Sequence, residues 1–237
     1  MFPEGVYGRA MPIAADRVPE RLPRGRHGLP RRFIVHNQRE RMLLAVAEAV
    51  AEQGFATTTV ADIIARARLS RRTFYEHFAD KEECFLAAYD TVVEQLLSAV
   101  GQAYEQADGW TQKVHDGLET FLAYLAAEPA FARMCIVEVV AAGPEARSRR
   151  DAAMRVFVDF LEPGRAEAPR GVRVPDIAAE VVVGGIYEII YSRLQRDAAD
   201  ELVEMLPELL YCVLVPYIGH REAERAVATA RERAGAA

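Results

Sequence analysis

The 237-residue sequence has few of the features that mark secreted or membrane proteins. Its three cysteines, Cys84, Cys135 and Cys212, lie far apart without CxxC spacing. They predict neither a disulfide framework nor a zinc site, and they suit a reducing compartment. No apolar run reaches the roughly 18 residues of a membrane span. The first arginines are not followed by the apolar stretch of a secretory signal. We therefore expect a cytoplasmic protein without a membrane partner.

Motifs of the common enzyme classes are also missing. We find no GxSxG, P-loop or HExxH, and no GxGxxG after a predicted strand. His115 and Glu119 lie four residues apart on one predicted helix, with Asp116 between them. No second histidine is near in the sequence, so this pattern supports a metal site only weakly. We expect a protein without catalysis, metal or cofactor, and a helical enzyme is the main alternative.

Positive charge is concentrated at one end of the chain. Residues 1–81 hold 14 basic and 9 acidic residues, a net charge of +5, whereas residues 82–237 hold 15 and 26, a net charge of −11. An acidic protein with one basic end is expected to meet DNA at that end only. The alternative is a chance drift of charge.

The basic end begins with a proline-rich stretch, residues 1–35. It has five prolines, and its seven arginines face only three acidic residues. Because little of it could be buried in a core, we predict a mostly disordered basic arm. Its arginines, such as Arg24, Arg26, Arg31 and Arg32, would add contacts to phosphates or the minor groove. Equally, the arm could be a leader without a function.

From about residue 36 onward apolar residues recur at spacings of three and four, which predicts an all-α fold. Glycines, prolines and capping residues divide the chain into helices near 37–53, 58–67, 71–78, 81–107, 110–127, 130–142, 144–161, 176–196 and 200–218, with a loop at 163–175. We expect a DNA-binding domain at 36–82 and a helical effector-binding and dimerisation domain at 83–219. Residues 220–237 would form a tail, at most a frayed helix.

Residues 58–78, TTVADIIARARLSRRTFYEHF, predict a helix-turn-helix with its turn at 68–70. Apolar residues supply a face that can pack on the preceding helix: Val60, Ile63, Ile64, Ala67, Leu69, Phe74 and Phe78. The residues left exposed on the second helix suit phosphate oxygens and base edges: Arg71, Arg72, Thr73, Tyr75, Glu76 and His77. An ordinary solvated helix face is the alternative.

This segment resembles the DNA-binding domain of the TetR/AcrR family of transcriptional regulators. The resemblance covers residues 39–85 and rests on Gly54-Phe55, Thr58, Thr59, Val60, Ile63, Ser70, Thr73, Phe74, Tyr75, His77, Phe78 and Asp80-Lys81-Glu82. It implies a repressor that binds near-palindromic double-stranded DNA as a homodimer and is released by an unknown small-molecule effector. A helical small-molecule-binding protein that has lost DNA binding is a further alternative, which the intact basic pair at 71–72 disfavours.

The resemblance also implies roles for single residues. Thr59 and Lys81 would contact phosphates, and Tyr75 and His77 would hold the DNA backbone. The major-groove end of the second helix would carry Arg71, Arg72 and Thr73; with the helix starts Thr58 and Ser70 these residues complete the predicted DNA-binding set.

Position 68 departs from the family pattern, because the family usually has glycine in this turn and this chain has Arg68. A positive φ there would strain an arginine by about 1–2 kcal/mol. Either the turn avoids that conformation, or Arg68 adopts it and gains a phosphate contact.

Candidates for an effector pocket are large or polar residues on otherwise apolar helix faces: Trp110, Phe121, Tyr124, Met134, Glu138, Phe157, Tyr187 and Tyr191. The aromatic residues could equally be plain core. Glu138 and Glu188 are more informative, since a carboxylate among apolar residues needs a partner. Each either binds an effector, pairs with an arginine or faces water.

Residues 181–194 and 206–218, within the last two predicted helices, are apolar around most of the helix circumference, more than one surface helix needs. Two adjacent glycines inside a helix cost about 1 kcal/mol each, which close approach to another helix would justify. We expect two copies of this helix pair to form a four-helix dimer interface through Gly184, Gly185, Ile189, Leu210, Leu214 and Tyr217. The alternative is that both helices belong to the core of one chain.

Overall fold

The computed structural model describes residues 31–171 and 173–236, and every regular element in these ranges is a helix. The predicted all-α fold is therefore confirmed. The α-helices are α1 (Arg31–Gln53), α2 (Val60–Ala67), α3 (Arg71–Tyr75), α4 (Lys81–Gln106), α5 (Trp110–Ala127), α6 (Pro129–Ile136), α7 (Pro144–Leu161), α8 (Ala178–Gln195), α9 (Leu206–Ile218) and α10 (His220–Ala236). Three 3₁₀ helices join them: η1 (Glu138–Val140), η2 (Glu162–Glu167) and η3 (Ala199–Met205).

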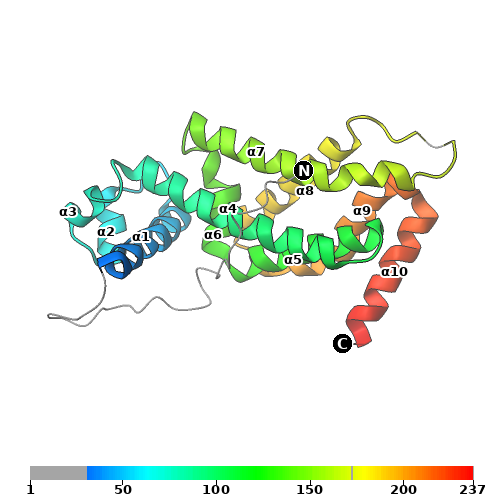
Figure 1. Cartoon of the computed structure of the whole chain (residues 1–237), viewed down its shortest axis with the longest axis horizontal. Helices are drawn as coiled ribbons and strands as arrows, with labels where there is room; N and C mark the ends of the chain where they lie inside the picture. The colour runs from blue at the N-terminus through cyan, green and yellow to red at the C-terminus, as the bar shows by residue number, and fades with distance from the viewer. Residues whose placement is uncertain (1–30, 172, 237) are drawn as a thin grey trace.

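Helices α1 to α3 form a small bundle at one end of the elongated molecule, and α4 runs from this bundle into the larger carboxy-terminal one (Figure 1). The first helix begins at Arg31, earlier than the predicted start near Asn37. The rest of the predicted arm, including Arg24 and Arg26, lies outside the described residues. The predicted boundaries of α5 and α7 agree with the structure.

One apolar cluster joins the two bundles. Met42 and Val46 of α1, Phe74 of α3 and Phe85 of α4 are fully buried in it, and Met134 of α6 belongs to the same cluster. Burial of this shared surface resists separation of the bundles. Helices α4 and α6 are therefore packed against the core of the helix-turn-helix.

The carboxy-terminal bundle differs from the sequence prediction at its ends. The predicted tail is α10, whose Ala223 and Val227 are buried against α9. The predicted helix 200–218 is split into η3 and α9, because Pro207 lies in the first turn of α9 and lacks the N–H that would continue a helix through it. No single described helix is long and apolar enough to cross a membrane, although the sharply bent pair Trp110–Ala127 and Pro129–Val140 has the length and composition.

The predicted loop at 163–175 is partly ordered as η2. Gly164 is buried there beneath Trp110, and a Cβ at this position would lie 2.2 Å from the indole ring. The Arg165 guanidinium donates to the carbonyls of Val174, Pro175 and Asp176. These bonds tie the connection back onto the bundle and bring α8 alongside α7.

Candidate nucleic-acid interface and ligand cavity

The helix-turn-helix begins with a capping box at Thr59, the residue before α2. The Thr59 hydroxyl accepts a hydrogen bond from the Asp62 N–H at 3.3 Å, and the Asp62 carboxylate accepts one from the Thr59 N–H at 2.9 Å. The hydroxyl and N–H of Thr59 hold the pKa of Asp62 below its usual value. This cap fixes where α2 starts and leaves Thr59 exposed at that end.

Arg68 in the turn adopts the left-handed conformation, with φ 52° and ψ 45°. Of the two alternatives left open by the sequence, the turn therefore does not avoid positive φ. The Arg68 N–H donates to the Ala65 carbonyl at 3.2 Å, and the Leu69 N–H donates to the Ile64 carbonyl at 3.0 Å. These bonds close the last turn of α2. The Arg41 guanidinium donates to the carbonyls of Ala67 and Arg68 and so secures the turn on α1.

Helix α3 presents a polar face to solvent and an apolar face to the core. Ser70 caps it by accepting a hydrogen bond from the Thr73 N–H at 3.0 Å. Phe74 is fully buried, whereas Tyr75 on the other side is 53% exposed. Arg71 and Arg72 are also exposed. Four residues of the predicted exposed face are thus exposed, namely Arg71, Arg72, Tyr75 and Glu76, whereas Thr73 and His77 are half-buried.

Arg72 already has a partner on the same helix, since its Nε lies 3.0 Å from Glu76 Oε1. The Arg72 side chain is 90% exposed and that of Glu76 is 56% exposed. Exposed ion pairs of this kind contribute little free energy. Arg72 can therefore exchange Glu76 for a nucleic-acid oxygen at small cost.

Two residues of the predicted DNA-binding set are engaged inside the protein. Thr58 is buried, and its hydroxyl donates to the Gly54 carbonyl at 2.8 Å. The Lys81 ammonium donates to the carbonyls of Phe55 and Thr58 at 2.9 and 2.8 Å, and it lies 4.5 Å from the centre of the Phe55 ring. Both side chains thus hold the connection between α1 and α2, and Lys81 would reach a phosphate only by giving up these bonds.

His77 follows α3 and is half-buried. Its Nε2 lies 3.4 Å from Gln38 Oε1 of α1. Burial lowers the pKa of His77 below 6.5, and the nearby Arg39 adds to this effect. A neutral His77 that is anchored to α1 is suited to positioning α3 on the bundle.

Glu138 has a partner that the sequence prediction did not consider. Its Oε2 accepts a hydrogen bond from the Phe55 N–H at 2.9 Å, across 83 positions of sequence. The carboxylate also lies 3.5 Å from where a Gly54 Cβ would be. Glu138 therefore does not line the cavity described below, and it links η1 to the connection before α2. Glu188, by contrast, is exposed on α8, which agrees with the water-facing alternative.

An apolar cavity lies between α4, α5, α6, α7 and α8. Four of the predicted pocket residues line it: Phe121, Tyr124, Phe157 and Tyr187. The cavity holds about 120 Å³, well below the roughly 300–1,000 Å³ of typical ligand pockets. A ligand of ordinary size must therefore move side chains or helices to enter.

The other four predicted pocket residues lie elsewhere. Trp110 packs on Gly164, with its ring 4.9 Å from that of Tyr217. Met134 is fully buried in the cluster shared by the two bundles. Tyr191 accepts a hydrogen bond from Gln195 at 2.7 Å on the outside of α8. Together with Glu138, these residues have structural partners that their local sequence does not reveal.

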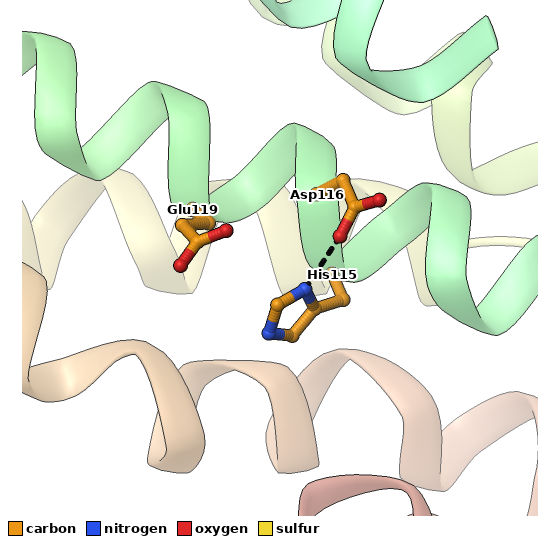
Figure 2. Close-up of side chains that lie close together, drawn as sticks. All are labelled: His115, Asp116 and Glu119. Atoms are coloured by element: carbon orange, nitrogen blue, oxygen red, sulfur yellow. Dashed lines mark hydrogen bonds and ion pairs between the residues drawn. The ribbon is translucent and has the colours of Figure 1, made fainter. Parts of the chain in front are cut away.

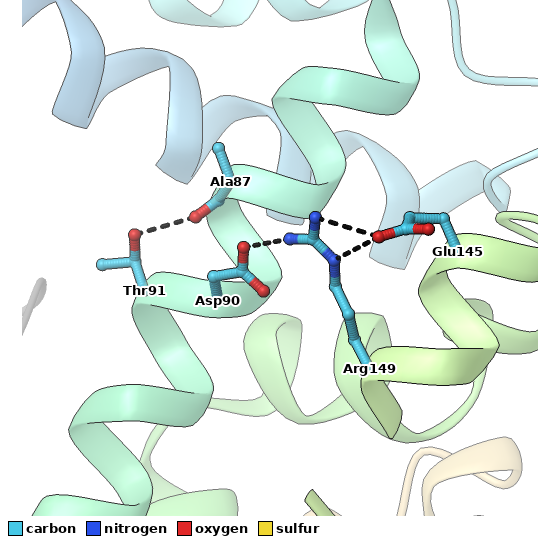
Figure 3. Close-up of polar contacts among 5 residues, drawn as sticks. All are labelled: Ala87, Asp90, Thr91, Glu145 and Arg149. Carbon is cyan, nitrogen blue, oxygen red and sulfur yellow. Dashed lines mark hydrogen bonds and ion pairs between the residues drawn. The ribbon is translucent and has the colours of Figure 1, made fainter. Parts of the chain in front are cut away.

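The ends of the cavity differ in polarity. Helices α4 and α7 run parallel, since Arg149 of α7 pairs with Asp90 of α4 at one end (Figure 3) and the Tyr104 hydroxyl donates to the Phe160 carbonyl at the other. Near the first end the lining includes Tyr89, Tyr124, Cys135, Arg150 and Tyr187; near the second it includes Val100, Val114, Leu161 and Val213. Among the residues that the structure describes, Arg150 is the only charged one in the lining.

His115, Asp116 and Glu119 form the spacing that supports a metal site weakly in the sequence. His115 Nδ1 lies 2.7 Å from Asp116 Oδ1, while the Glu119 side chain lies apart from this pair (Figure 2). Ligand atoms of all three lie within 4.8 Å of one another. They come from little more than one turn of α5, and the Gln112 amide donates to Asp116 at 2.6 Å. We assign this group no role.

The predicted dimer residues divide between surface and core. Gly184, Gly185 and Ile189 are exposed on α8. The predicted residues of α9 are 0–1% exposed in the core of the chain itself: Leu210, Leu214 and Tyr217. Their apolar character therefore reflects intrachain packing, which corrects the prediction. Two further exposed apolar residues were not predicted: Ile177, the N-cap residue of α8, is 60% exposed, and Val181 within α8 is 62% exposed.

Comparison with known proteins agrees with this geometry. The family model of the bacterial regulatory proteins of the tetR family matches residues 43–88. The HTH-type transcriptional activator FasR of Mycolicibacterium smegmatis is 28% identical over 111 residues, which span 47% of this chain and about half (51%) of that protein. The HTH-type transcriptional regulator EthR of the same species is 28% identical over 182 residues, covering 75% of this chain and 83% of that protein.

Solved structures show the same fold. The fatty acid degradation regulator FadR from Bacillus halodurans superposes with a TM-score of 0.67 at 16% identity, over 75% of this chain and 94% of that one. FadR from Bacillus subtilis, solved with stearoyl-CoA, gives 0.65 at 18% identity, over 74% and 97%. The helix-turn-helix at residues 43–88 is therefore similar to the DNA-binding domain of the tetR family of bacterial regulatory proteins, and the chain as a whole shares the fold of solved TetR family regulators.

Proposed function

We propose that this protein is a dimeric repressor that binds a near-palindromic operator through α3 and is released from it by a small molecule in the apolar cavity. The main support for the proposal is the exposed face of α3, which carries Arg71, Arg72 and Tyr75. On the opposite face of the same helix, Phe74 is fully buried in the core. A rigid apolar anchor with an exposed basic and aromatic face is what insertion into a major groove requires.

In this proposal Arg71, Arg72 and Thr73 contact base edges or nearby phosphates, while Ser70, Tyr75 and Thr59 contact the DNA backbone. His77, Thr58 and Lys81 support these contacts by fixing α3 and the connection before α2. The operator lies on bacterial DNA, so the proposed place of action is the cytoplasm.

The proposed dimer uses the exposed apolar face of α8. Ile177, Val181, Gly185 and Ile189 recur every four residues along this helix, so they lie along one side of it. A Cβ at Gly184 or Gly185 would meet nothing within 4 Å in the chain itself. Another helix can therefore approach closely there, and a two-fold pair of chains would present two α3 helices to successive major grooves about 34–36 Å apart.

Control by a ligand follows from the connection between cavity and DNA-binding bundle. Helices α4 and α6 line the cavity and also belong to the cluster that contains the helix-turn-helix core. A ligand that enlarges the small cavity favours a different arrangement of these helices, and operator affinity falls if that arrangement misplaces α3. The structure of FadR from Bacillus subtilis with stearoyl-CoA supports a long apolar molecule as the kind of ligand.

The proposal is tested by titrating salt against binding to the DNA upstream of the protein's own gene. Phosphate contacts predict that log K falls linearly with log salt. Arg71→Ala and Tyr75→Ala should each weaken specific binding at least tenfold. Arg155→Ala removes the same charge from the exposed surface of α7, far along the chain from α3, and should leave binding unchanged. Absence of any DNA binding at low salt, or equal losses in the Arg71 and Arg155 variants, would refute the proposal.

A further inference from the structure

The polar end of the cavity contains a positive charge without a carboxylate inside the cavity to neutralise it. Arg150 of α7 lies there beside Tyr89, Tyr124 and Tyr187, and no acidic residue of the described ranges, 31–171 and 173–236, lines the cavity. Burial raises the pKa of Tyr124 to about 12 and also raises the pKa of Tyr187. The tyrosines are therefore neutral near pH 7, and this end of the cavity is positively charged.

Arg150 lies at the rim of the cavity and is only partly committed to other groups. Its side chain is 28% exposed, and its guanidinium lies 5.6 Å from the centre of the Tyr187 ring. It forms an ion pair with Asp151, whose Oδ1 accepts hydrogen bonds from Nε and Nη2 at 3.0 and 2.6 Å, and it also interacts with the Tyr187 hydroxyl. Asp151 is 51% exposed, so this ion pair is screened by water and contributes little. An anion that enters from the cavity side can compete with it in a less hydrated setting.

The rest of the cavity suits an unbranched apolar chain. Lining residues on α4 extend from Tyr89 to Tyr104, which is about 22 Å along the helix at 1.5 Å per residue. Valine, leucine and phenylalanine side chains of α4, α5 and α7 surround this length. A long, narrow and apolar space with a cation at one end is complementary to a long apolar molecule that carries an anion at one end.

We propose that the effector is a single-chain amphiphile with an anionic head group, whose head is held by Arg150 and whose chain extends between α4, α5 and α7 toward Val213. The inference rests on the proposed ligand control and specifies the chemistry of the ligand. The apolar chain of such a ligand cannot fit within about 120 Å³ unless these helices move apart. Its entry therefore acts on α4, the helix that continues into the DNA-binding bundle.

The experiment measures affinity by isothermal titration, without DNA, for four probes that each have a sixteen-carbon chain. Each probe is kept below the concentration at which it aggregates. Palmitate and palmitoyl-CoA carry anionic heads, hexadecanol is neutral, and hexadecyltrimethylammonium is cationic. We expect at least one anionic probe to bind tenfold or more tighter than hexadecanol, as a charge-assisted hydrogen bond provides. Palmitate and palmitoyl-CoA distinguish a free carboxylate from a phosphate-bearing carrier as the source of the anion.

Three variants assign the preference to Arg150. Arg150→Met should abolish the preference for the anionic probe while hexadecanol binds as in the wild type, and Arg150→Lys should retain part of it. Arg155→Met, an exposed arginine on the same helix, should change nothing. Thermal unfolding of each variant confirms that hexadecanol binding is compared between folded proteins.

The inference is overturned if the wild type binds hexadecanol as tightly as the anions, if Arg150→Met keeps the anionic preference, or if no probe binds. Because the assay contains no DNA, these outcomes are independent of operator binding. Failure to bind operator DNA with the head-group preference intact would instead remove the proposed DNA-binding function and leave the ligand assignment standing.

Discussion

Arg68 holds a left-handed backbone conformation that L-amino acids seldom adopt, with φ 52°. We expect Arg68→Gly to raise the free energy of unfolding by about 1 kcal/mol, because glycine adopts this conformation without a Cβ clash and loses only part of the gain to its more flexible unfolded state. Denaturation with urea measures the change. Arg66→Gly, two residues earlier inside α2, should lower the free energy by about 1 kcal/mol. A loss in both variants would show that Arg68 is not strained.

The caps around this turn show how much a single residue reveals. Thr59, Ser70 and Asp80 are of the residue types that favour N-caps, and the side chain of each accepts a hydrogen bond from the N–H three residues later. A cap needs only its own neighbours in sequence, so its prediction is secure. Lys81 lies one residue after such a cap, yet its ammonium donates to carbonyls some 23 to 26 positions away. That role depends on how α4 packs against α1.

At the scale of the element, α6 and η1 connect the cavity to the helix-turn-helix. Cys135 and Ile136 line the cavity, and Glu138 just beyond them accepts the hydrogen bond from the Phe55 N–H. Lys81 of α4 holds the carbonyl of the same Phe55. The connection between α1 and α2 is thus bonded to α4 and to η1, which follows α6, and both α4 and α6 line the cavity.

We expect Glu138→Ala to leave the Phe55 N–H without its partner and to lower the free energy of unfolding by about 1–3 kcal/mol. Glu138→Gln keeps an acceptor oxygen and should cost less. Measured with and without palmitate, operator affinity should respond several-fold less to the ligand in Glu138→Ala than in the wild type. An unchanged response in a folded Glu138→Ala protein would mean that this bond does not couple the two sites.

At the scale of the whole molecule, the proposed dimer places exposed apolar surface of α8 against a second copy. Val181→Glu puts a charge on a side chain that is 62% exposed in the single chain. We expect it to convert the protein to monomers in analytical ultracentrifugation and to weaken operator binding, because burial of an unpaired charge in the interface is costly. Ala152→Glu on the exposed surface of α7 is the matched control. Dimers of unchanged stability in Val181→Glu would place the interface elsewhere.

The six residues predicted for this interface divide between surface and core for one reason. Gly184, Gly185 and Ile189 are exposed as the dimer requires, whereas Leu210, Leu214 and Tyr217 are buried within the chain. An apolar helix needs a neighbour, but its sequence does not say whether that neighbour belongs to the same chain. The neighbours of α9 include α5 and α10 of the same chain. The segment of α10 is predicted from sequence only as a tail, so its contribution to the burial of α9 is not apparent there.

The sequence by itself determined the helix-turn-helix, the all-helical fold and most helix boundaries, because periodicity, caps and glycine or proline stops act over a few residues. It also determined which side of α3 faces solvent. Only the tertiary structure decided that Glu138 bonds Phe55, that Trp110 covers Gly164 and that Arg150 lies in the lining of an apolar cavity. These features depend on contacts between distant segments, and such contacts exist only once close packing has selected one arrangement of the helices.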